Sequence, residues 1–238
     1  MTSKQLVFQD KEQKRVKQHI FDEVAEFSYQ DFEDLKTNKS YDRFEVGNLE
    51  VPSGKIVCTD PMYRALGFPQ SWEVARGNYP VNIYIGLEDD FVGRVAYAEL
   101  VFSEEAIESW QFSLIEESLL KDDFEKKMNG MYPVENGLGS FSDYDVWKEY
   151  TAYFSQYQKK SKEANFYTDI LDEQFRANNG IPKSSRGNDW VNYKLESGKG
   201  NVIMFGSGWG DGLYARYVAF DKQGNPVKLI TDFIRISE

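Results

Sequence analysis

The alternation of apolar and polar positions predicts β-strands along much of the chain beyond residue 40. Residues 81–85 and 93–102 alternate in this way, and the acidic turn at residues 88–90 between them indicates a hairpin. Residues 60–80 lack a sustained alternation and are predicted to form a loop. Further strands are predicted at residues 44–46, 49–51, 55–58, 110–114 and 226–236.

Three segments repeat their apolar residues every three or four positions, which is typical of helices. They are residues 10–36, 142–158 and 163–177. Ser142 and Asp145 resemble a capping box, so the second helix is predicted to begin there. Its apolar face is predicted to pack on a sheet and consists of Val146, Trp147, Tyr150, Tyr153, Phe154 and Tyr157.

These elements together predict an α+β fold. Residues 1–40 are expected to form an N-terminal helical segment. Residues 41–238 are expected to form a single domain in which two or three helices pack on an antiparallel, β-rich sheet. Aromatic residues make up 16% of the sequence, which suits a sheet-rich core because aromatic side chains pack well on a pleated surface.

Residues 206–212 read Gly-Ser-Gly-Trp-Gly-Asp-Gly and carry the strongest local signal in the chain. Glycines at this density indicate positive φ angles or a close approach of backbone segments. The apolar run 201–205 precedes them and the apolar run 213–220 follows them. We therefore predict a strand, a glycine corner and a second strand, with Trp209 and Asp211 presented on the corner.

The charge of the chain restricts its partners. The 238 residues include 39 acidic and 28 basic side chains, with a formal net charge of −11. This charge repels nucleic acid, whereas a basic protein would be attracted; acidity also serves solubility alone. No apolar run is long enough to span a bilayer, and the N-terminus has no signal-peptide pattern. The sequence predicts a soluble cytoplasmic protein that binds no membrane.

Histidine and cysteine occur once each, which restricts the chemistry. His19 is expected to be a solvated residue of the N-terminal helix, and Cys58 a small buried side chain on a strand. A zinc site of the Cys/His type is excluded by this count. Gly206-Ser207-Gly208 does not have the Gly-x-Ser-x-Gly spacing of a nucleophile elbow. No catalytic residue, metal ligand or cofactor is predicted from these residues.

Five residues remain as candidates for a binding site. Asp60, Asp211 and Asp232 lie at strand ends or in an apolar run, where a carboxylate needs hydrogen bonds or a cation. The alternative is that they accept hydrogen bonds from backbone amides at turns. Tyr79 and Trp209 are candidates for exposed aromatic anchors, and the alternative for them is a place in the core beside a turn.

Several short motifs occur in an order that points to a known family. They are the segments 53–54, 60–61, 77–81, 94–98, 137–143, 207–214 and 229–233. Together they resemble the bacterial domain-of-unknown-function family numbered 4241, over about residues 50 to 236. Ser140 stands where that family often has cysteine, so no cysteine-based role is implied there. The family implies no established activity, but small acidic proteins of this kind resemble immunity partners of secreted toxins.

Two functions are compatible with these observations. The interpretation that we favour is a non-enzymatic binding protein, such as an immunity protein that neutralises a bacterial toxin. The alternative is a carboxylate-based enzyme that uses a divalent cation. Clustering of Asp60, Asp211 and Asp232 in one concave pocket would favour the enzyme. An acidic surface elsewhere would favour the binding protein.

Overall fold

The computed structural model describes residues 32, 35–63, 67–187 and 189–234. The chain divides into a first unit that ends at Asn38 and a second unit that begins at Lys39. The strands and helices below belong to the second unit. The helix predicted over residues 10–36 and the single histidine, His19, fall almost wholly outside the described residues.

The larger of two sheets contains seven of the described strands. They are β1 (Tyr41–Val51), β4 (Gly77–Gly86), β5 (Val95–Val101), β6 (Ser109–Phe112), β7 (Met131–Val134), β11 (Gly212–Phe220) and β12 (Pro226–Asp232). Their order is β1-β4-β5-β12-β11-β6, and every pair is antiparallel. β7 also pairs with β11, along the half that begins at Gly212.

The smaller sheet contains five of the described strands. They are β2 (Lys55–Thr59), β3 (Pro69–Glu73), β8 (Leu138–Asp143), β9 (Trp190–Lys194) and β10 (Asn201–Gly206). Their order is β3-β2-β8-β10-β9, again antiparallel throughout. These two antiparallel sheets, together with three described α-helices, confirm the predicted α+β class.

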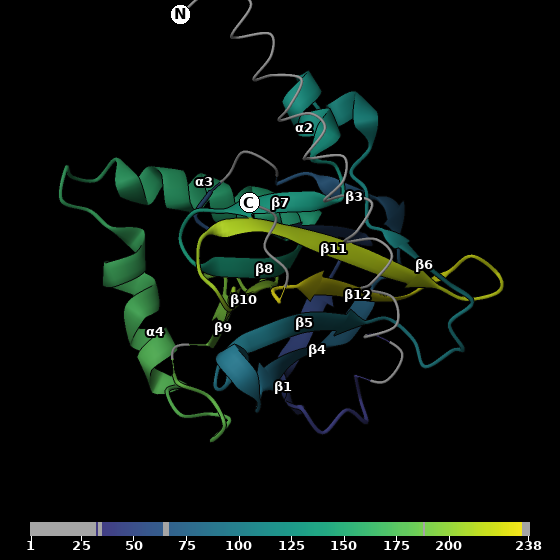
Figure 1. Ribbon diagram of the computed structural model, residues 1–238. Coiled ribbons are helices and arrows are strands. Elements are labelled where there is room, and N and C mark those ends of the chain that lie inside the picture. The colour runs from purple at the N-terminus through teal and green to yellow at the C-terminus, as the bar shows by residue number, and fades with distance from the viewer. Residues whose placement is uncertain (1–31, 33–34, 64–66, 188, 235–238) are drawn as a thin grey trace, which may run out of the picture. The chain divides into compact units, whose positions relative to one another are not determined.

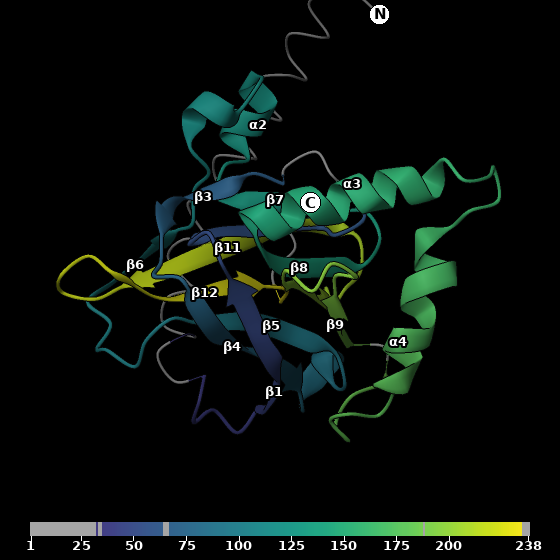
Figure 2. The same cartoon turned by 180° about the vertical axis from the view of Figure 1, so that it is seen from behind.

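The helices gather on the smaller sheet. α3 (Tyr144–Gln158) contacts β2, β8 and β10, and α4 (Asp172–Ala177) contacts β9. Figures 1 and 2 show α3 running beside β8, with α4 at the end where β9 lies. α2 (Asp123–Lys127) is a short helix between β6 and β7. None of the described helices has both the length and the apolar character that crossing a membrane requires.

The side chains of β10 pack in both hydrophobic cores and so connect the layers of the fold. Ile203 and Phe205 pack in a core that includes residues of both sheets, whereas Val202 and Met204 pack in a second core with the helices. Because successive side chains of a strand point to opposite faces, one apolar run supplies both cores. The smaller sheet is therefore the middle layer, between the larger sheet and the helices.

Some predicted strands were wrong in extent. The strands predicted at residues 44–46 and 49–51 are one strand, β1, with a bulge between Glu45 and Gly47, and the φ of Gly47 is 130°. The predicted loop at residues 60–80 contains β3 and the beginning of β4. β3 was missed because it is a polar edge strand, in which only Gln70 is buried. The final strand, predicted to reach residue 236, ends at Asp232.

The two helix predictions that fall on described residues were correct in place and wrong in detail. α3 buries the predicted residues Val146, Trp147, Tyr150 and Phe154. Its N-cap is Asp143, whose carboxylate accepts the Asp145 N–H at 2.9 Å, and not the predicted Ser142. The segment predicted as one helix over residues 163–177 is a π-helical turn, η3 (Tyr167–Leu171), followed by α4.

Candidate functional site

The glycine corner connects β10 to β11, as predicted. Gly208 has a φ of 62° and Gly210 a φ of 94°, so the predicted left-handed conformations are confirmed. A Cβ atom on Gly208 would lie 2.5 Å from the backbone oxygen of Val95. Glycine is thus needed there for both its φ angle and its close backbone approach.

Two local hydrogen bonds and one from a distant segment fix this corner. The Ser207 hydroxyl donates to the Gly210 carbonyl at 2.6 Å, and the Tyr214 hydroxyl donates to the same oxygen at 3.0 Å. The Arg94 guanidinium, on the chain just before β5, donates to the Gly208 carbonyl at 2.9 Å. The corner is therefore a well-ordered platform for the side chain at its tip.

Trp209 is that side chain, and it is 38% exposed. Its ring meets the ring of Phe91 edge to face at 4.8 Å, and the Arg94 guanidinium carbon lies 5.3 Å from its centroid. The indole N–H donates to the Ile234 carbonyl at 3.3 Å. The ring is thus held on several sides while part of it faces solvent, an arrangement that suits an interaction anchor.

Asp60 and Asp211 bind successive amides of the turn between β7 and β8. One oxygen of the buried Asp60 accepts the N–H groups of Glu135 and Asn136, at 2.9 and 3.2 Å. Its other oxygen accepts the N–H groups of residues 62 and 63. The exposed Asp211 accepts the next amide of the turn, that of Gly137, at 3.0 Å. Both carboxylates therefore stabilise the turn that lies against the glycine corner.

Asp232 stabilises the same region by accepting a backbone hydrogen bond. It is buried, and it accepts the N–H of Ile234, whose carbonyl in turn accepts the Trp209 indole. The three aspartates thus converge on backbone amides around the corner. Among the described residues, no group of three His, Cys, Asp or Glu side chains is placed to hold a metal ion.

A cavity of about 260 Å³ opens beside the corner. Arg94, Arg186, Asp189 and Trp209 line it together with the corner glycines. Burial raises the pKa of Asp189 to about 7, against a smaller opposing effect of the Gly187 backbone. Within the described part of the chain, the Asp189 Oδ2 atom has no hydrogen-bond partner. This aspartate was missed, because its segment reads as a polar loop.

A hydrophobic and acidic loop adjoins Trp209. Leu87 and Val92 are exposed large apolar side chains on either side of η1 (Asp89–Phe91), which also contains Phe91. The three residues before Phe91 are exposed acids: Glu88, Asp89 and Asp90. In Figures 1 and 2 this loop, between β4 and β5, lies beside the segment that follows α4, and the Arg186 N–H donates to the Gly93 carbonyl at 2.9 Å.

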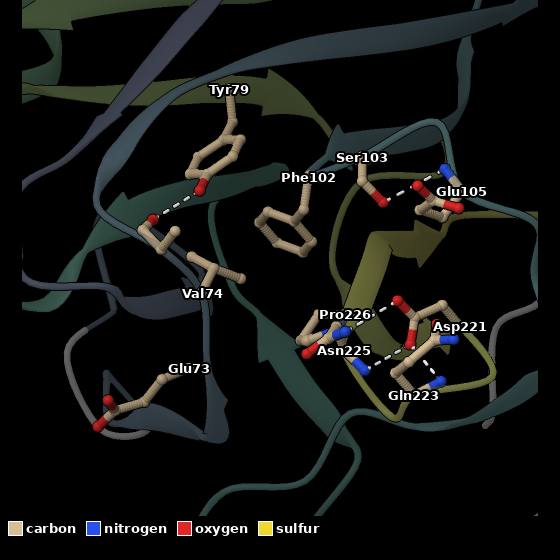
Figure 3. A pocket seen from close by; sticks show the side chains of 11 residues that line it. Glu73, Val74, Tyr79, Phe102, Ser103, Glu105, Asp221, Gln223, Asn225 and Pro226 are labelled. Carbon is tan, nitrogen blue, oxygen red and sulfur yellow. Dashed lines mark hydrogen bonds between the residues drawn. The ribbon is translucent and has the colours of Figure 1, made fainter.

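Tyr79 lies apart from the other four candidates. It is half-buried on β4, and its hydroxyl donates to the Ala75 carbonyl. Its ring packs edge to face on Phe102, with centroids 5.3 Å apart. Both rings line a separate cavity of about 570 Å³, which Figure 3 shows. The five candidates predicted from the sequence thus belong to two different regions of the molecule.

Cys58 is buried on β2, as predicted. Its sulfur lies 3.3 Å from the Thr231 hydroxyl oxygen, and burial raises the pKa of the thiol. A thiol in this environment is a poor nucleophile, since the thiolate is the reactive form.

Comparison with known proteins identifies the family. No curated protein matches the chain, and no solved structure matches it. A family model with the description "protein of unknown function (DUF4241)" matches residues 49–231, from within β1 to the penultimate residue of β12. The chain belongs to this DUF4241 family.

Proposed function

We propose that this protein binds a basic protein partner through the face that carries Trp209. The observation that supports the proposal is an exposed indole held by Phe91, Arg94 and the Ile234 carbonyl. A rigid, half-exposed aromatic ring loses little conformational freedom on binding, so such rings are often the energetic centre of an interface. Leu87 and Val92 are exposed apolar side chains on the same loop as Phe91.

Acidic side chains near this face support a basic partner. Glu88, Asp89 and Asp90 precede Phe91, while Glu135 and Asp211 lie at the braced turn, and all five are exposed. They belong to a chain with a net charge of −11. Negative charge at the rim of an apolar patch steers a basic protein toward it and raises the association rate. A toxin neutralised by this protein is a partner of this kind.

The test is binding kinetics with the product of the neighbouring gene, after co-expression and purification of the complex. Trp209→Ala should raise the dissociation rate by about 30-fold, as expected for an anchor worth about 2 kcal/mol. The double change Asp89→Asn and Asp90→Asn should mainly lower the association rate and weaken its dependence on salt. A matched control changes two distant exposed acids, Glu163→Gln and Glu173→Gln.

The control separates local from overall charge, because both pairs remove two negative charges. Equal effects of the two pairs would contradict a docking face at Trp209. So would unchanged dissociation from Trp209→Ala in a folded variant. Absence of any complex with the neighbouring gene product would favour the second candidate.

That second candidate is a carboxylate-based enzyme. The observation in its favour is Asp189, since a pKa of about 7 suits a general acid or base. Two arginines, Arg94 and Arg186, line the same cavity and could hold an anionic substrate. Loss of a measured activity in Asp189→Asn, with partner binding absent, would support the enzyme.

A further inference from the structure

The cavity beside Tyr79 has a composition of its own. It lies where β3 ends, β4 begins, β5 ends and the turn between β11 and β12 approaches. Figure 3 shows Tyr79, Phe102 and Val74 around its centre, with Glu73, Glu105 and Asp221 toward its margins. At about 570 Å³, it can admit a long side chain.

The centre of the cavity is apolar and fixed. Phe102 packs edge to face against Tyr79 on one side and against Trp72 on the other, at 5.3 and 5.4 Å. Tyr79 is also held by its hydroxyl bond to Ala75. Because these rings are held by contacts within the protein, they can accept methylene groups or a planar cation with little reorganisation.

The margins of the cavity are negative. Asp221 accepts two backbone N–H groups and the side-chain amide of Asn225, which hold the pKa of its carboxyl below the usual range. Glu105 is exposed, and Glu73 is shared with Lys55 at 3.4 Å. The lining residues include these three carboxylates and no basic side chain. Such a lining favours a cation over phosphate or carboxylate.

We propose that this cavity binds an arginine side chain of a polypeptide. The alkyl stem would lie on Phe102 and Val74, and the guanidinium would meet the Tyr79 ring and the marginal carboxylates. Arginine fits better than lysine, because its planar group stacks on aromatic rings and donates two hydrogen bonds to one carboxylate. The inference rests on the proposed function in one respect: the arginine belongs to the basic partner, at a second point of contact.

The experiment titrates the full-length protein with a capped five-residue peptide, Gly-Gly-Arg-Gly-Gly, and follows amide shifts by NMR. The matched probe contains citrulline, which keeps the shape of arginine and loses its charge. We expect shifts at residues around Phe102 with the arginine peptide and none with citrulline. A lysine peptide and free arginine should bind more weakly, and free arginine binding more tightly would overturn the polypeptide assignment.

Variants connect the shifts to the cavity. Glu105→Gln removes an exposed charge at the margin and should weaken arginine-peptide binding by about fivefold. Tyr79→Leu keeps an apolar side chain and should weaken it further, whereas the control Glu163→Gln should leave it unchanged. Equal binding of the arginine and citrulline peptides, or no effect of either cavity variant, would overturn the proposal.

The Trp209→Ala variant separates this proposal from the proposed function. It should bind the arginine peptide like the parent, because Trp209 does not line this cavity. Partner binding that depends on Trp209, with no arginine-peptide binding, would refute the cavity assignment alone. Arginine-peptide binding without any partner complex would refute the Trp209 face alone.

Discussion

Two buried aspartates near the glycine corner have opposite surroundings. Asp60 is fully buried, and its two oxygens accept backbone N–H groups from two separate segments. Asp189 is 8% exposed, yet its Oδ2 atom has no hydrogen-bond partner among the described residues. The same residue type thus has hydrogen bonds to both carboxylate oxygens in one place, whereas one oxygen has no described partner in the other.

The difference shows how to separate a structural carboxylate from a candidate functional one. A buried carboxylate surrounded by amides replaces its lost hydration and holds the segments that donate to it. A buried carboxylate with fewer such donors retains its proton more strongly, and burial raises the pKa of Asp189 to about 7 despite the opposing Gly187 backbone interaction. Asp60 therefore braces the site, whereas Asp189 is available for a change in charge within it.

The largest expected effect comes from removing the satisfied carboxylate. Asp60→Ala should lower the free energy of unfolding by about 3–5 kcal/mol, because it leaves several buried N–H groups without an acceptor. Asp60→Asn should cost less, since one oxygen remains to accept two of them. Urea unfolding followed by circular dichroism measures both values. A loss below about 1 kcal/mol in Asp60→Ala would contradict the bracing role.

Asp189 should lower the free energy of unfolding when it is ionised, in contrast to Asp60. Its contribution should therefore depend on pH. In the unfolded chain Asp189 releases its proton near pH 4, but in the folded protein it keeps the proton up to about pH 7. The folded state thus binds more protons between these values, so the free energy of unfolding should fall as the pH rises from 4 to 7. Asp189→Asn should remove this part of the decline.

Unfolding at pH 5 and pH 8 tests the expectation. At pH 8 the Asp189→Asn variant should exceed the parent by about 1–2 kcal/mol, with allowance for solvent screening. At pH 5 the difference should be smaller, because Asp189 is then protonated in the fold. Taking the difference between variant and parent cancels the contributions of titrating groups that the substitution leaves unchanged. An equal difference at both pH values would show that burial does not raise the pKa of Asp189.

Local pattern was enough to find the elements with strong periodicity. α3 was predicted correctly, because its apolar residues follow the helical period of about 3.6 residues. β10 was predicted correctly, because apolar residues fill both of its faces. β3 was missed, because an exposed edge strand leaves no clear period. The π-helical turn η3 was read as ordinary helix, because apolar spacing alone does not distinguish the two. The division of the strands into two sheets also has no local signal, as β2 and β8 pair across about eighty residues.

The site was predictable only where it is encoded locally. Four glycines within seven residues identified the corner and its exposed Trp209. The partners of that corner could not be found in this way: Arg94 is 114 positions away from Gly208. The burial of Asp189 likewise depends on packing between β9, β10 and β5, where the Gly206 N–H donates to the Asp189 carbonyl.

The smallest expected effect comes from Asp211, which sharpens the comparison on a single turn. Asp60 and Asp211 accept neighbouring amides of that turn, but Asp211 is exposed and accepts the single N–H of Gly137 there. Water can replace an acceptor at an exposed amide, so Asp211→Ala should cost under about 1 kcal/mol. Urea unfolding of Asp211→Ala and Asp60→Ala, measured in parallel, tests this prediction. A cost equal to that of Asp60→Ala would mean that burial is not what distinguishes the two carboxylates.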